Sequence, residues 1–320
     1  MKTAAAGARA PRTARDVTTR ASRRRAQVSE CILVPALGVL PWSVAWPMMR
    51  WMAQRGGLFD DAAQRAAEVA DTRGFVGDRR EWLGSYRLTR IVDQVDPVLA
   101  ALRGDRWMDR HLVVEGDPLP RPPCVLVGFH YGAGFWTLRH LRRHAHRVAF
   151  VSARVDSTQA PGEPLRLALM RRRIAWIERA GGAPVIFVGG STERIRAALR
   201  TGTSILGMVD VPQPPSAGGV ERPFLDGMAR FPDGLVRLAA AEGVPIIAYL
   251  PRLDRATGDR RLTLTRLPAG AEDSMRALVA MLDRAVREDP AAWHLWAHWP
   301  WSESEAAPGT RTVEFDEPAR

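Results

Sequence analysis

The chain contains 320 residues, of which 46% are hydrophobic and 25% charged, a composition that excludes wholesale disorder. Its length fits one large domain or two small ones. Two cysteines, Cys31 and Cys124, are too few for a disulfide scaffold or a four-cysteine zinc site. The net charge of +11 is placed unevenly, because residues 1–26 contain eight basic residues and one acidic residue.

Residues 1–26 are predicted to form a disordered basic tail, since they lack any apolar periodicity. Such a tail either adheres to an anionic membrane surface or is solvated without a partner. The rest of the chain has no comparable basic stripe. We therefore expect no nucleic-acid partner.

Residues 31–49 contain no charged side chain, and their number is near the minimum for a membrane span. Pro35, Pro41 and Pro47 weaken a helix here. Three interpretations remain open: a span or re-entrant anchor, a helix lying in the membrane interface, or a buried globular segment. We expect a helical, membrane-associated segment over residues 27–58, with the N-terminus on the cytoplasmic side because basic residues precede it.

The pattern then changes from helical to an alternation of strands and helices. Residues 60–103 show helical periodicity in two segments, the second with a stop or kink near Pro97. A buried strand is predicted over residues 124–130, after a proline-rich connector. Further apolar strands are predicted within 146–154, 183–190, 203–212 and 244–252, and an exposed or edge strand within 260–270. Helices are predicted within 135–146, 162–181, 191–202, 230–243 and 272–293.

This alternation predicts an α/β domain over residues 59–302, with a mixed, largely parallel sheet flanked by helices. Residues 303–320 are expected to form a C-terminal tail. In sheets of this kind, ligands bind beyond the carboxyl ends of the strands. His130, Asp210 and Pro251 each follow an apolar strand, which makes them candidate site residues.

The strongest local motif is VLVGFHYGAGFW, residues 125–136. Here His130 follows a buried strand directly, and small residues then lead into a helix. This placement exposes an imidazole beside backbone N–H groups, as a general base requires. The alternative is a structural histidine in a glycine turn. Gly128, Gly132 and Gly134 do not have the spacing of a dinucleotide-binding fingerprint.

Three other motifs have simpler explanations. The two glycines and two hydroxyls of residues 189–192 either bind an anion at a helix start or merely cap that helix through Ser191 or Thr192. Three histidines within 140–146 are flanked by arginines, so we expect a solvated basic face and no metal. The aromatic residues of 289–301, with His294 and His298, are typical of core or interface packing.

Several blocks follow one another in a recognisable order. An apolar segment at 31–49 precedes the strand that ends at His130, and a basic helix carries Arg179. Later blocks include Leu199, Gly202 and Asp210, then residues 219–227, 244–252 and 296–301. From about residue 30 to residue 301, this order resembles the late lauroyl/myristoyl acyltransferases of lipid A biosynthesis, a branch of the lysophospholipid acyltransferase superfamily.

The resemblance implies a glycerolipid acyltransferase-like fold. It also implies acyl transfer from an acyl carrier protein or acyl-CoA thioester to a hydroxyl or amine of a lipid or lipid-like acceptor. His130 would be the base on the acceptor. Substrate binding is implied for Gly132, Gly134, Arg154, Arg179 and His298. We expect no cofactor and no metal, and the expected location is the cytoplasmic face of a bacterial inner membrane.

The chain departs from this family where the orienting carboxylate should stand, because Phe135 occupies the position five residues after His130. Three explanations remain open. Asp210 or Asp156 supplies the acid, His130 works without an acid, or the chain is a catalytically silent relative that binds a lipid or a carrier. A soluble hydrolase that uses the same histidine is a weaker alternative. The family's C-terminal arginine pair is also replaced, by Trp299 and Pro300.

Overall fold

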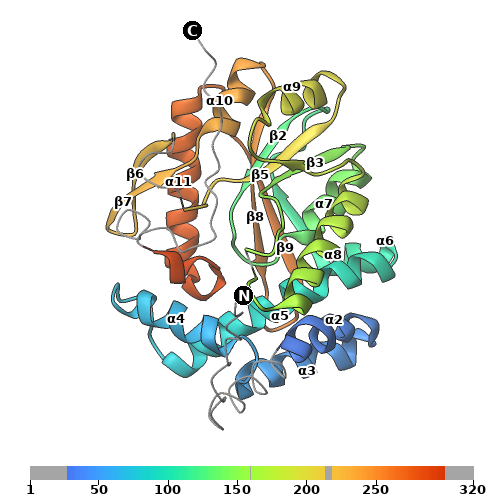
Figure 1. Cartoon of the computed structure of the whole chain (residues 1–320), viewed down its shortest axis with the longest axis vertical. Coiled ribbons are helices and arrows are strands. Elements are labelled where there is room, and N and C mark those ends of the chain that lie inside the picture. The colour runs from blue at the N-terminus through green and yellow to red at the C-terminus, as the bar shows by residue number, and fades with distance from the viewer. Residues whose placement is uncertain (1–26, 159, 213–217, 300–320) are drawn as a thin grey trace, which may run out of the picture.

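The computed structural model describes residues 27–158, 160–212 and 218–299. The predicted tails, 1–26 and 303–320, lie outside these residues. The described residues confirm an α/β architecture in which helices flank a mostly parallel sheet of seven strands (Figure 1). Its strand order is β1-β9-β8-β2-β5-β3-β4, and a separate antiparallel hairpin pairs β6 with β7.

The strands are short and each pairs in a defined register. All sheet pairs are parallel except β8 with β9. The bounds are β1 Leu112–Gly116, β2 Val125–Gly128, β3 Val148–Ser152, β4 Ile186–Phe187, β5 Ser204–Met208, β6 Val220–Phe224, β7 Gly227–Phe231, β8 Ile246–Leu253 and β9 Arg260–Arg266.

Two apolar cores cover the two faces of the sheet. In β2, Val125 and Val127 face one core and Leu126 faces the other, so this central strand is buried on both sides. The first core also contains α4 (Asp60–Asp71), α10 (Gly234–Ala241) and α11 (Ala271–Glu288). The second contains α3 (Trp42–Arg55), α5 (Arg79–Leu102), α7 (Phe135–Arg143) and α8 (Pro164–Gly181). Figure 1 shows α10 and α11 on the opposite side of the sheet from α7 and α8.

The remaining helices are short. They are α2 (Val34–Ala36), α6 (Asp105–His111) and α9 (Thr192–Arg200). Single turns of other helix types complete the set: η1 (Ser29–Leu33), η2 (Leu37–Val39), η3 (Pro290–Ala292) and η4 (Trp296–His298).

The uncharged segment 31–49 is broken rather than continuous. It passes through η1, α2 and η2 before α3 begins after Pro41. Within the described residues, no helix combines the length and the apolar character that crossing a membrane requires. The segment packs against α5 through Val34, Met49 and their neighbours, yet it leaves several large apolar side chains exposed.

A buried ion pair joins α5 to the sheet. The guanidinium of Arg260 on β9 donates to both carboxylate oxygens of Asp96, and the two side chains are 2% and 0% exposed. The same guanidinium lies over the indole of Trp136, 4.3 Å from its ring centre. This contact links α5 directly to β9.

Several sequence predictions about individual elements were wrong. The strand predicted to be exposed or at an edge, β9, lies between β1 and β8. The sheet edge on that side is β1, which was not predicted. Of the stop or kink predicted near Pro97, the stop does not occur, since α5 continues through Pro97 to Leu102. Ser191 does stand at the N-cap position of α9, but its side chain makes no capping hydrogen bond. The last helix ends at Glu288 and not near Trp293. The block 219–227 contributes to an unpredicted hairpin.

Candidate active site

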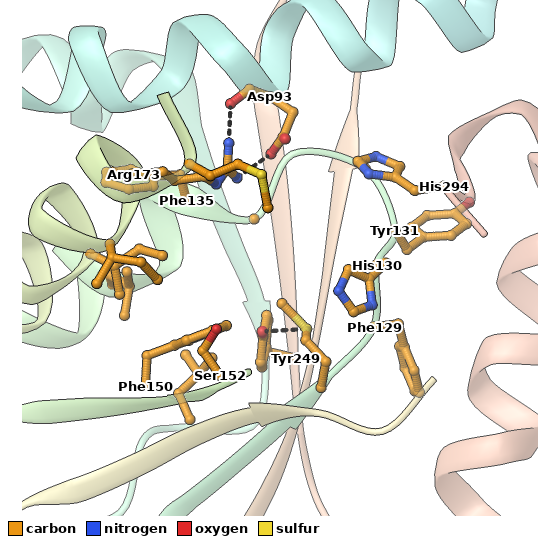
Figure 2. A pocket seen from close by; sticks show the side chains of 18 of the residues that line it. Asp93, Phe129, His130, Tyr131, Phe135, Phe150, Ser152, Arg173, Tyr249 and His294 are labelled. Atoms are coloured by element: carbon orange, nitrogen blue, oxygen red, sulfur yellow. Dashed lines mark hydrogen bonds and ion pairs between the residues drawn. The ribbon is translucent and has the colours of Figure 1, made fainter. Parts of the chain in front are cut away.

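A cavity of about 340 Å³ opens beyond the carboxyl end of β2 (Figure 2). Its polar end is formed by His130, His294, Asp93 and Arg173. The rest of the wall is mainly apolar and comes from β3, β5, α7 and α8: Phe135, Leu138, Phe150, Met170, Ile174, Ile177, Leu206 and Met208. Figure 2 shows His130 and His294 on one side of the cavity and Phe150 on the opposite side.

Strand register brings His130 and Asp210 together. The parallel neighbours β2 and β5 pair Gly128 with Met208, and the two candidate residues each stand two positions further along. The Nδ1 atom of His130 lies 2.9 Å from Asp210 Oδ1. The backbone N–H of His130 also donates to Asp210 Oδ2 at 2.8 Å.

Asp210 is fully buried, and its hydrogen bonds orient the imidazole. A third donor, the indole N–H of Trp293, reaches Asp210 Oδ2 at 3.0 Å. Because the carboxylate only accepts, the proton of the neutral imidazole stands on Nδ1 and leaves the lone pair on Nε2. Within the described residues that Nε2 makes no hydrogen bond, and the His130 side chain is 37% exposed.

The carboxylate also tunes the basicity of His130. Burial by itself would lower the pKa of His130. The negative charge of Asp210 and its hydrogen bond outweigh burial, so the pKa is raised above 6.5. A histidine with its lone pair free and its pKa raised by a carboxylate is suited to take a proton from an acceptor group.

An ion pair closes the polar end of the cavity. Arg173 on α8 donates to the Asp93 carboxylate at 2.8 Å and to the Asp93 backbone carbonyl at 3.1 Å. That carbonyl is free because Pro97, four residues later in α5, has no N–H to donate to it. Burial would raise the pKa of Asp93, but the charge of Arg173 leads the effects that hold it below its ordinary value.

A second histidine, His294, lies beside His130. The backbone N–H of His294 donates to the carbonyl of His130 at 2.9 Å. The neighbouring residues Tyr131 and Trp293 form an antiparallel bridge between the loop after β2 and the segment after α11. The His294 ring contacts Arg90 of α5, with 3.1 Å between Nη1 and Nδ1. Residues from α5, from the loop after β2 and from the segment after α11 therefore meet at one point.

The predicted substrate-binding glycines lie in the cavity wall, but one of them has no free N–H. Gly132 has a φ of +60°, and a Cβ there would approach Pro251 O to 2.3 Å, so only glycine fits. Its N–H donates to the Ala292 carbonyl at 2.9 Å. Gly134 precedes α7 and also lines the cavity.

The structure does not bring the other predicted binding residues to this cavity. Arg179 lines a neighbouring hollow with Arg139 and Arg142, and Phe135 is shared between the two hollows. Arg154 is exposed and lies over the Phe187 ring. His298 is exposed on η4 and is not part of the cavity wall.

The structure also separates the two carboxylates that were alternatives for the acid. Asp156 accepts hydrogen bonds from Thr158 in the loop after β3, and Asp210 contacts His130. Phe135 is 5% exposed and forms apolar wall at the start of α7. The carboxylate that contacts His130 therefore comes from the segment after β5 and not from the start of α7.

Sequence reasoning missed Arg90, Asp93 and Arg173, and it assigned Trp293 and His294 to packing. Arg90 and Asp93 belong to a row of charged residues at a spacing of three along α5, together with Arg87 and Asp96, and this row was the available signal. Arg173 is one of three consecutive arginines, so nothing in the sequence distinguishes it.

The part of the chain that the structure describes contains no group of three or more histidine, cysteine or acidic side chains that could hold a metal ion. Comparison with known proteins finds no matching family model and no matching curated protein. Function must therefore be inferred from the geometry of the site itself.

Proposed function

We propose that the protein transfers an acyl group from an acyl carrier protein or acyl-CoA thioester to a hydroxyl or amine of a lipid or lipid-like acceptor. One observation carries this proposal: the oriented His130–Asp210 pair stands at the polar end of a cavity whose remaining wall is apolar. An apolar cavity accommodates an acyl chain, at about 0.8 kcal/mol for each buried methylene. The polar end would then hold the thioester carbonyl beside the base.

The reaction would follow general-base acyl transfer. The acceptor oxygen or nitrogen bonds to the carbonyl carbon while its proton moves to His130 Nε2, and the C=O electron pair moves onto oxygen. Asp210 stabilises the imidazolium that forms. The carbonyl then re-forms, the C–S bond breaks, and His130 returns the proton to the leaving thiolate.

The position of Asp210 bears on the alternative of a catalytically silent relative. That alternative drew its support from Phe135, which cannot orient an imidazole. Asp210 makes the contact with Nδ1 that an orienting acid makes, and Trp293 holds it in place. We therefore favour an enzyme and treat silent binding as an outcome of the test.

We also propose that the protein works at an anionic membrane surface, on the cytoplasmic face of a bacterial inner membrane. Large apolar side chains between residues 28 and 51 are exposed, at the end of the molecule where Figure 1 shows α2 and α3. They follow the basic residues of the N-terminal sequence, and basic charge adds attraction to anionic lipid. The exposed set is Val28, Ile32, Leu33, Val39, Val44, Met48 and Trp51.

The activity test uses detergent-purified protein, a labelled acyl-carrier-protein thioester and total membrane lipid. We expect label to reach a lipid with the wild type and with His144→Ala, a control histidine exposed beyond α7, but not with His130→Ala. Release of free acid, unchanged by added acceptor, would favour the hydrolase. Binding of the thioester without any loss of it would favour the silent relative.

The membrane test is flotation with phosphatidylglycerol vesicles and with phosphatidylcholine vesicles. We expect the wild type to float with the anionic vesicles, and the double variant Val39→Glu/Trp51→Glu to lose most of this binding. Met228→Glu is the matched control, because Met228 is equally exposed but lies on β7. Equal loss in the control would contradict a specific docking face.

A further inference from the structure

The imidazole of His294 has a buried nitrogen for which the described part of the chain provides no hydrogen-bond partner. This nitrogen is Nε2. The residue lines the same cavity as His130, and Figure 2 shows its ring above that of His130. Buried polar atoms are nearly always hydrogen-bonded in folded proteins, so an exception in a cavity wall calls for a partner that arrives from outside.

Arg90 fixes which nitrogen of His294 carries the proton. A guanidinium has only donors, and its Nη1 lies 3.1 Å from His294 Nδ1. The Nδ1 atom must therefore accept, and the proton of the neutral ring stands on Nε2. The unpartnered atom is consequently an N–H donor and not a lone pair.

The surroundings of His294 keep its ring neutral. Burial and then the positive charge of Arg90 lower the pKa of His294 to about 3, although Asp93 acts in the opposite direction. His130 and Arg173 add to the lowering. The two histidines that line the cavity thus differ in basicity: the pKa of His130 is raised, so it takes up a proton more readily, whereas His294 resists a second proton and stays neutral.

Two nearby backbone donors are already in use within the fold. The N–H of His130 donates to Asp210, and the N–H of Gly132 donates to the Ala292 carbonyl. The hydrogen bond from the His294 backbone to the His130 carbonyl fixes the two residues beside each other. His130 and the free N–H of His294 therefore belong to the same cavity wall, where a substrate carbonyl held beside His130 has His294 as a further donor.

We propose that His294 is a catalytic residue whose Nε2–H donates a hydrogen bond to the thioester carbonyl oxygen as it becomes an oxyanion. This inference rests on the proposed acyl transfer. Two charges develop in the transition state, on the carbonyl oxygen and on the imidazole of His130. In this proposal His294 stabilises the negative charge on the oxygen, and Asp210 stabilises the positive charge on His130. Loss of one oxyanion donor typically lowers kcat by about 10²–10³-fold.

The kinetic test compares His294→Leu with His294→Gln. Leucine is similar in size to histidine but has no donor, and the glutamine amide places an N–H close to the position of Nε2. We expect kcat to fall by about 10²–10³-fold in His294→Leu with KM nearly unchanged, and to recover at least tenfold in His294→Gln. Circular dichroism and thermal melting establish that both variants fold.

Three results would overturn the inference. A kcat of His294→Leu within about threefold of the wild type would leave acyl transfer standing and remove His294 from it. An equal rise in KM with unchanged kcat would make His294 a ground-state binding residue. A wild type that shows no thioester turnover would overturn both this inference and the proposed function.

Nitrogen-15 NMR of the histidine rings provides a measurement that does not depend on activity. We expect His294 to be neutral and protonated on Nε2 at pH 5, and Arg90→Met to populate the Nδ1-protonated tautomer. A charged His294 at pH 5, or protonation on Nδ1 in the wild type, would contradict the inference even if activity were lost in His294→Leu.

Discussion

Replacement of Asp210 by asparagine should leave the fold in place and remove most of the rate. The carboxylate accepts three hydrogen bonds, two on Oδ2 and one on Oδ1. An amide has one accepting oxygen, so one group must face the NH₂. The least costly arrangement keeps the oxygen toward the His130 N–H and Trp293, because the reverse leaves two buried donors unpaired at about 1–3 kcal/mol each.

The NH₂ of the introduced asparagine would in that arrangement donate to His130 Nδ1, so the imidazole proton moves to Nε2 and the base is lost. The corresponding change in a serine-protease triad costs about 10⁴ in kcat, or roughly 5 kcal/mol at about 1.4 kcal/mol per factor of ten. We expect a loss of this order in single-turnover consumption of the thioester.

The pH–rate profile gives the same substitution a second measurement. In the wild type, activity should fall as the pH drops through the raised pKa of His130, because the protonated ring cannot act as base. In Asp210→Asn the carboxylate no longer offsets the effect of burial, so the pKa of His130 should fall. The acidic limb of the pH–rate profile should therefore move to lower pH. Glu193→Gln, which alters an exposed carboxylate on α9, is the control. A rate within tenfold of the wild type, or an unmoved limb, would refute the reasoning.

Three further predictions concern the cavity wall, the buried ion pair and the indole at Asp210. Met170→Trp should shorten the preferred acyl chain, because the larger side chain fills part of the cavity and each excluded methylene weakens donor binding about fourfold. Rates measured with a series of donors of increasing chain length test this. Asp96→Leu and Arg260→Met should each cost about 3–5 kcal/mol of unfolding free energy in urea, and the double variant should recover most of it; single losses below about 1 kcal/mol would contradict a buried pair. Trp293→Phe should cost about 1.5–3 kcal/mol in the same assay, since it removes a hydrogen bond to a charged group; an unchanged midpoint would show that the bond is dispensable.

The class of fold was predictable because alternating strands and helices have a distinct pattern. The sheet edge was not predicted, because β1 has only five residues and its apolar part, Leu112 to Val114, is a short run that directly follows helix α6. Helix α5 continues through Pro97 because a tertiary contact satisfies the carbonyl that the proline leaves free. Arg173, 80 residues away from Asp93 in sequence, makes that contact.

The candidate site likewise contains some residues that the sequence predicted and others that it did not. The rule that ligands bind beyond strand ends selected His130 and Asp210 from the sequence, and strand register explains their contact. Trp293 and His294 were not selected, because the sequence of an aromatic cluster does not show which of its ring N–H groups reach a functional site. Arg179 and Arg154 were expected from resemblance alone, and the cavity lies elsewhere.

The bridge between Tyr131 and Trp293 has a consequence for the order of folding. It joins segments separated by about 160 residues, and Arg90 and His294 are separated by 204. Contacts of such long range close late and slow the folding of a domain. The last strand of the sheet ends at Arg266. Asp210 receives the hydrogen bond from the Trp293 indole only after the segment that follows α11 has docked. Refolding should therefore restore the sheet and the His130–Asp210 contact before it restores the Trp293 hydrogen bond and the His294 ring, so that the complete site marks the last step of folding.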